Sequence, residues 1–423
     1  MTSTANDAFD ARGVLLSGFL PAALFAIGEG AIIPIIPIAA NSLGASLAIA
    51  GFVASLILVG ELIGDVPSGV VVARIGERNA MIGAALVSMV GLVVCTVAPN
   101  TVLLAVGVFL VGVSTAVFAL ARHAYMTTAI PVHIRARALS SLGGVFRFGY
   151  FVGPFLAAGV VHLTGTTQSA FWIHIVCCLA AAVTLLVLRD PATGVRGLRL
   201  PRGASSPDHT ATDTGAVFVQ QEAQGLFRTI RTHRKVLLRL GSGAGLIGAM
   251  RAGRQVILPL WAVSVGLDDA TAALVIGIAG AVDFALFYTS GQIMDRWGRL
   301  ASALPCLLGL SVSYFLLAWS GHLDARVGWF VGIAIGMSLA NGVGSGILMT
   351  LGADLAPRDA PAPFLGAWRF TGDFGQAAAP LVISGITAVA SIAVASGVMG
   401  VLGLVGAGVL LRYVPRYLPR QLR

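Results

Sequence analysis

Long apolar segments recur along the whole chain, and short polar or charged stretches separate them. Twelve of these segments have about 18 residues or more, which is long enough for a helix to cross a bilayer core of roughly 30 Å. Helices are expected because a backbone in lipid must satisfy its own hydrogen bonds, and the ten-residue alternation of a β-barrel does not appear. The segments lie at roughly 14–40, 47–72, 80–98, 101–126, 139–163, 169–188, 236–262, 270–292, 300–320, 327–350, 363–386 and 392–411.

Composition agrees with this pattern. Of the 423 residues, 57% are hydrophobic and only 11% are charged, whereas soluble domains have about 25% charged residues. The stretch before the first segment contains Asp7 and Asp10 and lacks a basic region, and the segment is too long for a signal peptide. We therefore expect an all-α membrane protein that retains its first helix.

The net charge of +9 is distributed unevenly. With an even number of helices, both termini and most arginines fall on one side of the membrane, while the opposite loops contain only Arg326. This positive-inside bias predicts cytoplasmic termini in a cell's inner (plasma) membrane and offers no reason to expect nucleic-acid binding.

Motifs for enzyme chemistry are absent from the sequence. There is no P-loop, zinc-protease motif or hydrolase elbow. The four cysteines lie inside apolar segments, where thiols behave as small hydrophobic groups: Cys95, Cys177, Cys178 and Cys306. We expect neither an enzyme nor a cofactor or metal site.

The chain repeats itself at a shift of 222 residues. The stretch SGVVVARIGER at 68–78 aligns with SGQIMDRWGRL at 290–300. Matched arginines, glycines and prolines outside that stretch are Pro37 with Pro259, Gly44 with Gly266, Gly144 with Gly366, Arg147 with Arg369 and Gly153 with Gly375. The repeat predicts two pseudo-symmetric six-helix halves, residues 1–188 and 236–423, an arrangement common in secondary transporters.

Residues 189–235 between the halves have a different composition. Pro, Gly, Ser, Thr and Asp dominate up to about residue 223, which is typical of a flexible linker. The following stretch QGLFRTIRTHRKVLLRL has apolar residues at helical spacing and five basic residues. It predicts a short surface helix that either contacts anionic headgroups or is simply solvated.

Two six-helix halves, a basic central loop and a repeated turn resemble the major facilitator superfamily over the whole chain. The family signature in the turn is a Gly, an Asp four residues later, an Arg, a Gly and further basic residues. The first turn matches it at Gly69, Arg74, Gly76 and Arg78 but has Ala73 and Glu77 at the other positions; the second matches it at Gly291, Asp295, Arg296, Gly298 and Arg299. The resemblance implies that Asp295 latches the second half, while Ala73 leaves the first half without its acid.

Gly144, Gly153 and Pro154 in the expected fifth helix resemble a motif of the drug:proton antiporter branch. The resemblance implies proton-coupled efflux of small amphipathic or drug-like molecules by alternating access. Tight packing alone is the alternative explanation of the motif. Two alternative functions remain. The chain could be a proton-coupled importer of a small organic solute, or a membrane sensor or scaffold that transports nothing. The position that carries an arginine in the fourth helix of proton-coupled members is Val108, and Arg122 is interpreted as an interface anchor.

Charged residues inside apolar segments are costly and indicate function. Glu61 and Asp65 lie four apart on one helix face, and Arg369 and Asp373 are spaced to form a pair. The family fold places the fifth helix against the eighth and the second against the eleventh. We therefore expect contacts between the halves from Arg147 to Asp283 and from Arg369 to Glu61 or Asp65, the alternative being that each charge is satisfied in its own half.

The same resemblance implies that the first, fourth, seventh and tenth helices line a substrate cavity. Glu29, Arg251 and Arg254 are then the charges that face a small-molecule substrate, and Asn341 adds a polar contact or only sits in glycine-rich packing. We expect the proton to bind at Glu29, Glu61, Asp65 or Asp283. The expected partners are the substrate, protons and lipid, with the chain acting as a monomer.

Overall fold

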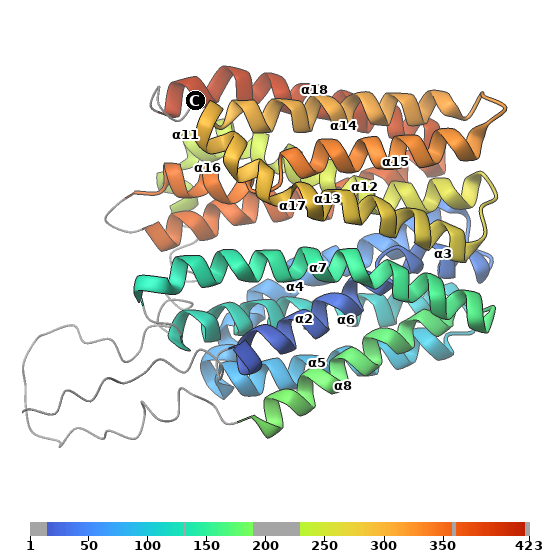
Figure 1. Ribbon diagram of the computed structural model, residues 1–423, viewed down its shortest axis with the longest axis horizontal. Coiled ribbons are helices and arrows are strands. Elements are labelled where there is room, and N and C mark those ends of the chain that lie inside the picture. Colours follow the sequence, from blue (N-terminus) through green and yellow to red (C-terminus); the bar gives the residue numbers. More distant parts are fainter. Residues whose placement is uncertain (1–14, 130–131, 189–228, 358–360, 419–423) are drawn as a thin grey trace, which may run out of the picture.

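Helices that run side by side make up nearly all of the described chain, which is residues 15–129, 132–188, 229–357 and 361–418 of a computed structural model (Figure 1). The first half contains a π-helical turn at Leu15–Phe19 and a 3-10 turn at Thr167–Ala170. Its α-helices are α2 (Leu20–Ile32), α3 (Ile35–Ser42), α4 (Leu47–Ile75), α5 (Glu77–Val97), α6 (Thr101–Ala129), α7 (Val132–Thr164) and α8 (Phe171–Val187).

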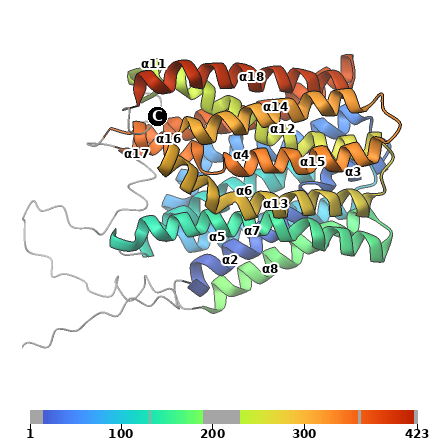
Figure 2. The ribbon, with the colours of Figure 1, turned by 45° about the horizontal axis from the view of Figure 1, so that its top comes forward.

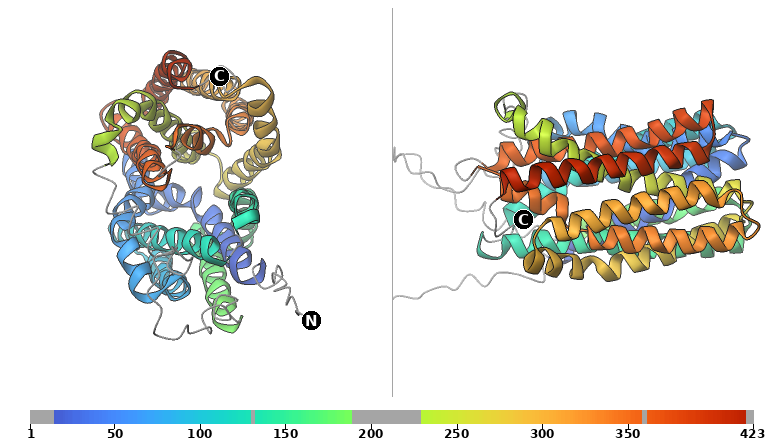
Figure 3. Two further views of the ribbon diagram at one scale, coloured as in Figure 1. Left: turned by 90° about the vertical axis from the view of Figure 1, so that its left-hand side faces the viewer. Right: turned by 90° about the horizontal axis from the view of Figure 1, so that it is seen from above.

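The second half begins with α11 (Arg234–Val236) and a π-helical turn at Leu237–Gly241. Its long helices are α12 (Ser242–Ser264), α13 (Asp269–Trp297), α14 (Leu300–Ser320), α15 (Arg326–Val343), α16 (Ile347–Leu355), α17 (Pro361–Val389) and α18 (Ile392–Tyr417). Figure 2 shows that the long helices of both halves run in nearly the same direction, and the end view on the left of Figure 3 shows the two halves as two groups of helices.

The twelve expected membrane helices are present. Within the described residues, ten helical segments are long and apolar enough to cross a membrane. The other two are α12 and α17, whose mean hydropathy is lowered by the charged pairs Arg251/Arg254 and Arg369/Asp373. Most of the predicted linker, residues 189–228, lies outside the described residues, so the surface helix stays a prediction.

Two membrane helices are broken. The first helix, expected as one segment at 14–40, stops at Ile32 and restarts at Ile35; Pro34 lies in this break and cannot donate a backbone hydrogen bond. The break between α15 and α16 is a correction, because the sequence predicted one continuous helix at 327–350. A side chain on Gly344 would come within 2.4 Å of the Cys306 sulfur, so the turn needs a glycine there.

The internal repeat is visible in the backbone. Gly76 and Gly298 end α4 and α13 with φ of +80° and +88°, in a region that favours glycine. Gly44 and Gly266 form an equivalent pair, with φ of +87° and +76°. The glycine matches found by the 222-residue shift therefore mark the same turns in both halves.

The halves touch at the end of the bundle opposite the C-terminus, which we call the distal end; α3 lies there in Figure 1. The Ser384 hydroxyl donates to the Ala48 carbonyl oxygen at 2.7 Å, and the Thr167 hydroxyl donates to Asp269 at 2.5 Å. Both contacts join the first half to the second. They hold the distal end together in this conformation.

Candidate functional site

Three helices of the second half and one of the first half meet around the carboxylate of Asp283, on α13. Arg254 Nη2 lies 3.1 Å from Asp283 Oδ2, and Asn341 Nδ2 donates to the same oxygen at 2.7 Å. Arg147 Nη1, from α7 of the first half, lies 4.0 Å from Oδ1. The structure thus brings together Arg147 and Asp283, as expected from the sequence, and adds two further partners.

We call Arg147, Arg251, Arg254 and Asp283 the arginine cluster. Arg147 Nη2 donates to the Ser345 carbonyl oxygen at 2.8 Å, and its guanidinium carbon lies 4.6 Å from the centre of the Phe287 ring. Arg251 Nη2 donates to the Gly344 carbonyl oxygen at 2.5 Å. Both carbonyls lie in the break between α15 and α16, and that of Gly344 also accepts a hydrogen bond from the Ile347 amide at 3.1 Å. Arg254 Nη1 donates to the Ser338 hydroxyl at 2.6 Å.

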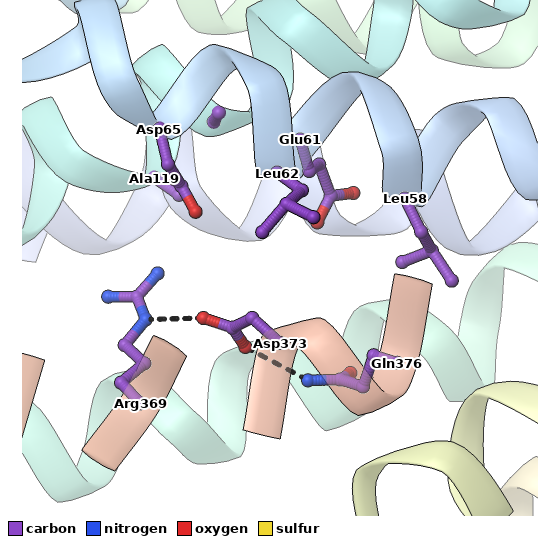
Figure 4. A pocket seen from close by; sticks show the side chains of 9 residues that line it. Leu58, Glu61, Leu62, Asp65, Ala119, Arg369, Asp373 and Gln376 are labelled. Carbon is purple, nitrogen blue, oxygen red and sulfur yellow. Dashed lines mark hydrogen bonds and ion pairs between the residues drawn. The ribbon is translucent and has the colours of Figure 1, made fainter. Parts of the chain in front are cut away.

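The second interface between the halves, α4 against α17, contains a small cavity of about 60 Å³ (Figure 4). Glu61 and Asp65 line it from α4, while Arg369, Asp373 and Gln376 line it from α17. Arg369 Nε lies 3.3 Å from Asp373 Oδ2, and Gln376 Nε2 donates to Asp373 Oδ1 at 3.0 Å. We call these carboxylates and Arg369 the acidic pocket. Pairing of Arg369 with Glu61 or Asp65 stays a prediction.

The two interfaces occupy equivalent places in the repeat but carry opposite charge. The arginine cluster has three arginines and one carboxylate, and the acidic pocket has three carboxylates and one arginine. Ala116 and Ala119, which line the acidic pocket, occupy the positions of the hydrogen-bonding Ser338 and Asn341. The other equivalent positions are Glu61 with Asp283, Asp65 with Phe287 and Arg147 with Arg369.

Glu29 lies inside the first half and is only 3% exposed. Its polar neighbours are Arg122 on α6 and Tyr150 on α7. Arg122 is 7% exposed and lies 3.9 Å from the centre of the Phe146 ring. The interpretation of Arg122 as an interface anchor was therefore wrong, and Tyr150 was missed because no charge or motif marks it.

The two repeated turns lie at the other end of the bundle from the distal end. Arg78 Nε donates to the Leu185 carbonyl oxygen at 2.7 Å, and Arg78 Nη2 donates to that of Leu188 at 2.7 Å, so Arg78 caps the end of α8. Gly69 and Gly291 lie inside α4 and α13, and Arg74 and Arg296 are exposed. Arg78 of the first turn thus links the turn to α8 of the same half through backbone carbonyl oxygens.

The second turn is stabilised by ion pairs between Arg299 and two carboxylates. Arg299 Nε lies 2.7 Å from Asp354 Oδ2 on α16, and Arg299 Nη1 lies 3.5 Å from Asp295 Oδ1. The hydrogen bond to Asp354 raises the pKa of Arg299 above its ordinary value. The Asp295 side chain is 83% exposed, so Asp354, which the sequence reasoning missed, is the more buried partner.

Close helix packing surrounds part of the motif at Gly144, Gly153 and Pro154 on α7. A side chain on Gly153 would come within 2.3 Å of the Ala31 backbone nitrogen. Its repeat mate Gly375 packs on Gly245 in the same way, with 1.9 Å to the carbonyl oxygen. Close packing therefore requires a glycine at Gly153, whereas a side chain on Gly144 would meet only the Phe287 ring, at 3.9 Å. A role of the motif in the direction of transport stays a prediction.

Comparison with known proteins places this arrangement in a family. A sequence model of the Major Facilitator Superfamily matches residues 18–380. The putative metabolite transport protein YwtG of Bacillus subtilis (strain 168) is 25% identical over 320 residues, which is 71% of this chain and 68% of that protein. The probable inositol transporter 2 of Arabidopsis thaliana is 26% identical over 114 residues, which is 27% of this chain and only 20% of that protein.

A crystal structure of a D-xylose-proton symporter has the same fold, with a TM-score of 0.73 at 14% identity over 97% of this chain and 98% of that chain. The family match covers most of the helices and both charged interfaces between the halves. This chain is therefore a multi-pass membrane protein and a secondary transporter rather than an enzyme, and it belongs to the major facilitator superfamily.

Proposed function

We propose that the chain is a proton-coupled transporter that moves a small organic solute by alternating access. The observation that supports this proposal is the acidic pocket, in which Glu61, Asp65 and Asp373 share one cavity with Arg369. Glu29 adds a further negative charge that acts on Glu61. Carboxylates that exceed their counter-ions inside a membrane are costly, and proton binding removes the excess charge.

The acidic pocket lies between the halves, so its net charge affects the position of one half relative to the other. Glu61 and Asp65 belong to α4 of the first half, and Asp373 belongs to α17 of the second half. Protonation weakens the repulsion between these helices, and proton release restores it. A proton gradient can therefore bias the rocking of one half against the other.

The names of the similar proteins refer to metabolite, inositol and xylose-proton transport. These names favour a small polar metabolite as the solute of this chain. Efflux of drug-like molecules is the second candidate, supported by the motif at Gly144, Gly153 and Pro154. We also propose cytoplasmic termini in a plasma membrane and a monomeric chain. The exposed Arg74 and Arg296 at the two repeated turns agree with this orientation.

The test is transport by the purified full chain in proteoliposomes with an imposed pH gradient of either sign. Labelled metabolites and drug-like compounds are followed together with a pH-sensitive dye. We expect one class of solute to accumulate with proton movement, and the sign of the effective gradient gives the direction.

Glu61→Gln should abolish accumulation against a gradient while solute exchange at equal pH persists. Asp324→Asn, at an exposed loop position, is the matched control. If Glu61→Gln and Asp65→Asn both accumulate solute like the parent, the acidic pocket is not the coupling site. Absence of flux for every compound under both gradients would instead favour the sensor or scaffold.

A further inference from the structure

We infer that the transported solute carries an anionic group, a carboxylate or a similar oxyanion, and that this group binds in the arginine cluster. The inference rests on the proposed function. It names the chemical class of the solute and the groups that recognise it. It is drawn from the excess positive charge of the cluster and from the buried polar atoms that have no partner there.

The charges of the arginine cluster do not balance. Arg147, Arg251 and Arg254 act electrostatically on one another, and Asp283 is the carboxylate among them. Two of the three guanidinium groups donate to neutral backbone carbonyls, those of Gly344 and Ser345. A carbonyl satisfies a hydrogen bond but does not neutralise a charge, so the cluster attracts an anion.

Unpartnered polar atoms accompany this excess charge. Among the described residues, Arg251 Nε and Arg254 Nε have no hydrogen-bond partner, and neither does the hydroxyl of Ser345, which is 5% exposed. Buried donors without acceptors are costly. An oxyanion can accept hydrogen bonds from donors of this kind.

Two acceptors in the cluster also lack a hydrogen-bond partner among the described residues. They are Asp283 Oδ1 and Asn341 Oδ1, and Asn341 is 6% exposed. An anion cannot satisfy them. A hydroxyl or amino group next to the oxyanion would, so the cluster suits a small hydroxy acid or amino acid better than a simple carboxylate.

The charged side chains of the cluster are not completely buried. The side chains of Arg147, Asp283 and Arg254 remain 23%, 15% and 12% exposed. The equivalent interface, the acidic pocket, has alanines where the cluster has Ser338 and Asn341. The fold therefore does not require polar side chains at these positions. In the cluster they hydrogen-bond to Arg254 and Asp283, and Asn341 Oδ1 remains available to a ligand.

The experiment measures thermal stability of the purified full chain with matched pairs of acids and their neutral amides. The probes are lactate and lactamide, alanine and alaninamide, citrate and inorganic phosphate, each at millimolar concentration and constant ionic strength. We expect at least one acid to raise the melting temperature while its amide does not. An equal effect of acid and amide, or no effect of any acid, would overturn the inference.

Variants locate the binding site. Arg251→Gln should weaken binding of the stabilising acid about tenfold or more, because a charge-assisted hydrogen bond is lost, while Arg251→Lys should weaken it less. Arg326→Gln, which removes an exposed arginine at the distal end, is the matched control. Unchanged binding in Arg251→Gln would contradict the assignment to the cluster.

Failure of this inference can be told apart from failure of the proposed function. Proton-driven transport of a neutral or cationic solute, with no binding of acids, would leave the proposed function standing and overturn the anion site. Binding of an acid to the cluster without any proton-driven flux would support the anion site and contradict the proposed function.

Discussion

Arg147 of the first half and Asp283 of the second half approach to 4.0 Å, whereas Arg254 holds the same carboxylate from within the second half at 3.1 Å. The contact between the halves is therefore the longer of the two. It can open without leaving Asp283 unpaired, because Arg254 and Asn341 remain bound to it. This geometry suits a contact that forms and breaks as the halves rock.

The first prediction separates these two contacts by mutation. Arg254→Met should destabilise the chain by about 3 kcal/mol, since it breaks the shorter buried pair. Arg147→Met should cost about 1 kcal/mol or less, since Asp283 keeps its other partners. Thermal unfolding in detergent measures both, and equal losses would contradict the ranking.

A double-mutant cycle completes this test. From the sequence, the pair Arg147→Met with Asp283→Leu is expected to recover folding. The structure predicts only partial recovery, because Arg254 remains without its carboxylate. Arg254→Met with Asp283→Leu should recover more stability, and the opposite order would show that Arg147 is the main partner.

The second prediction concerns the turn after α13. Asp354→Asn should loosen Arg299 and slow transport, at a cost of about 1–2 kcal/mol for the lost charged hydrogen bond. Asp295→Asn should have a smaller effect than Asp354→Asn, because its side chain is 83% exposed. The effect of Asp295→Asn should nevertheless be larger than that of any substitution at Ala73, the repeat mate of Asp295. Transport rates of the variants at equal protein density measure these effects.

The controls for the turn lie in the first half. Glu77→Gln changes the repeat mate of Arg299 and should leave the rate nearly unchanged. A larger loss from Asp295→Asn than from Asp354→Asn would instead support the latch expected from the family signature.

The third prediction tests packing at the glycines of α7 and α17. Gly153→Ala and Gly375→Ala should each destabilise the chain by about 1–3 kcal/mol, because the added methyl group meets backbone atoms of α2 or α12. Gly159→Ala and Gly385→Ala are controls, since a side chain at either position meets nothing within 4 Å. Expression and melting temperature give the readout. Equal behaviour of all four variants would show that close approach is not what requires these glycines.

The fourth prediction concerns pH and the caps of α4 and α13. Asp268 accepts a hydrogen bond from the Thr271 amide at 2.9 Å, and Ser46, its repeat mate, accepts one from the Ile49 amide at 3.3 Å. The hydrogen bonds with Thr271 lower the pKa of Asp268. Its stabilising effect is therefore present above the ordinary aspartate pKa of about 3.9 and is lost as the pH falls through the lowered pKa.

Asp268→Ala should thus lower the melting temperature at neutral pH, by an amount equivalent to about 1 kcal/mol, and less at low pH. Ser46→Ala should lower it by an amount that does not change with pH, because serine does not titrate in this range. Melting curves of both variants and the parent from neutral to acidic pH check this. A pH-independent loss in Asp268→Ala would show that the cap does not depend on the charge.

Much of the architecture follows from the sequence alone. A bilayer requires about 20 apolar residues for each helix, so hydropathy predicts the number and order of the helices. The 222-residue repeat locates the equivalent turns at Gly76 and Gly298, because a backbone with positive φ favours glycine in both halves. The repeat and the family fold also predict that Arg147 meets Asp283.

Only the tertiary structure decides which partners each charge takes. The sequence does not indicate that Arg254 and Asn341 share Asp283, that Arg122 is buried beside Glu29, or that Asp354 holds Arg299. These contacts depend on the rotation and depth of each helix. Helices that are apolar on nearly every face encode neither property, because lipid and protein neighbours accept the same side chains. Rotation and depth are fixed by close packing at glycines such as Gly153 and Gly375, which only the folded arrangement reveals.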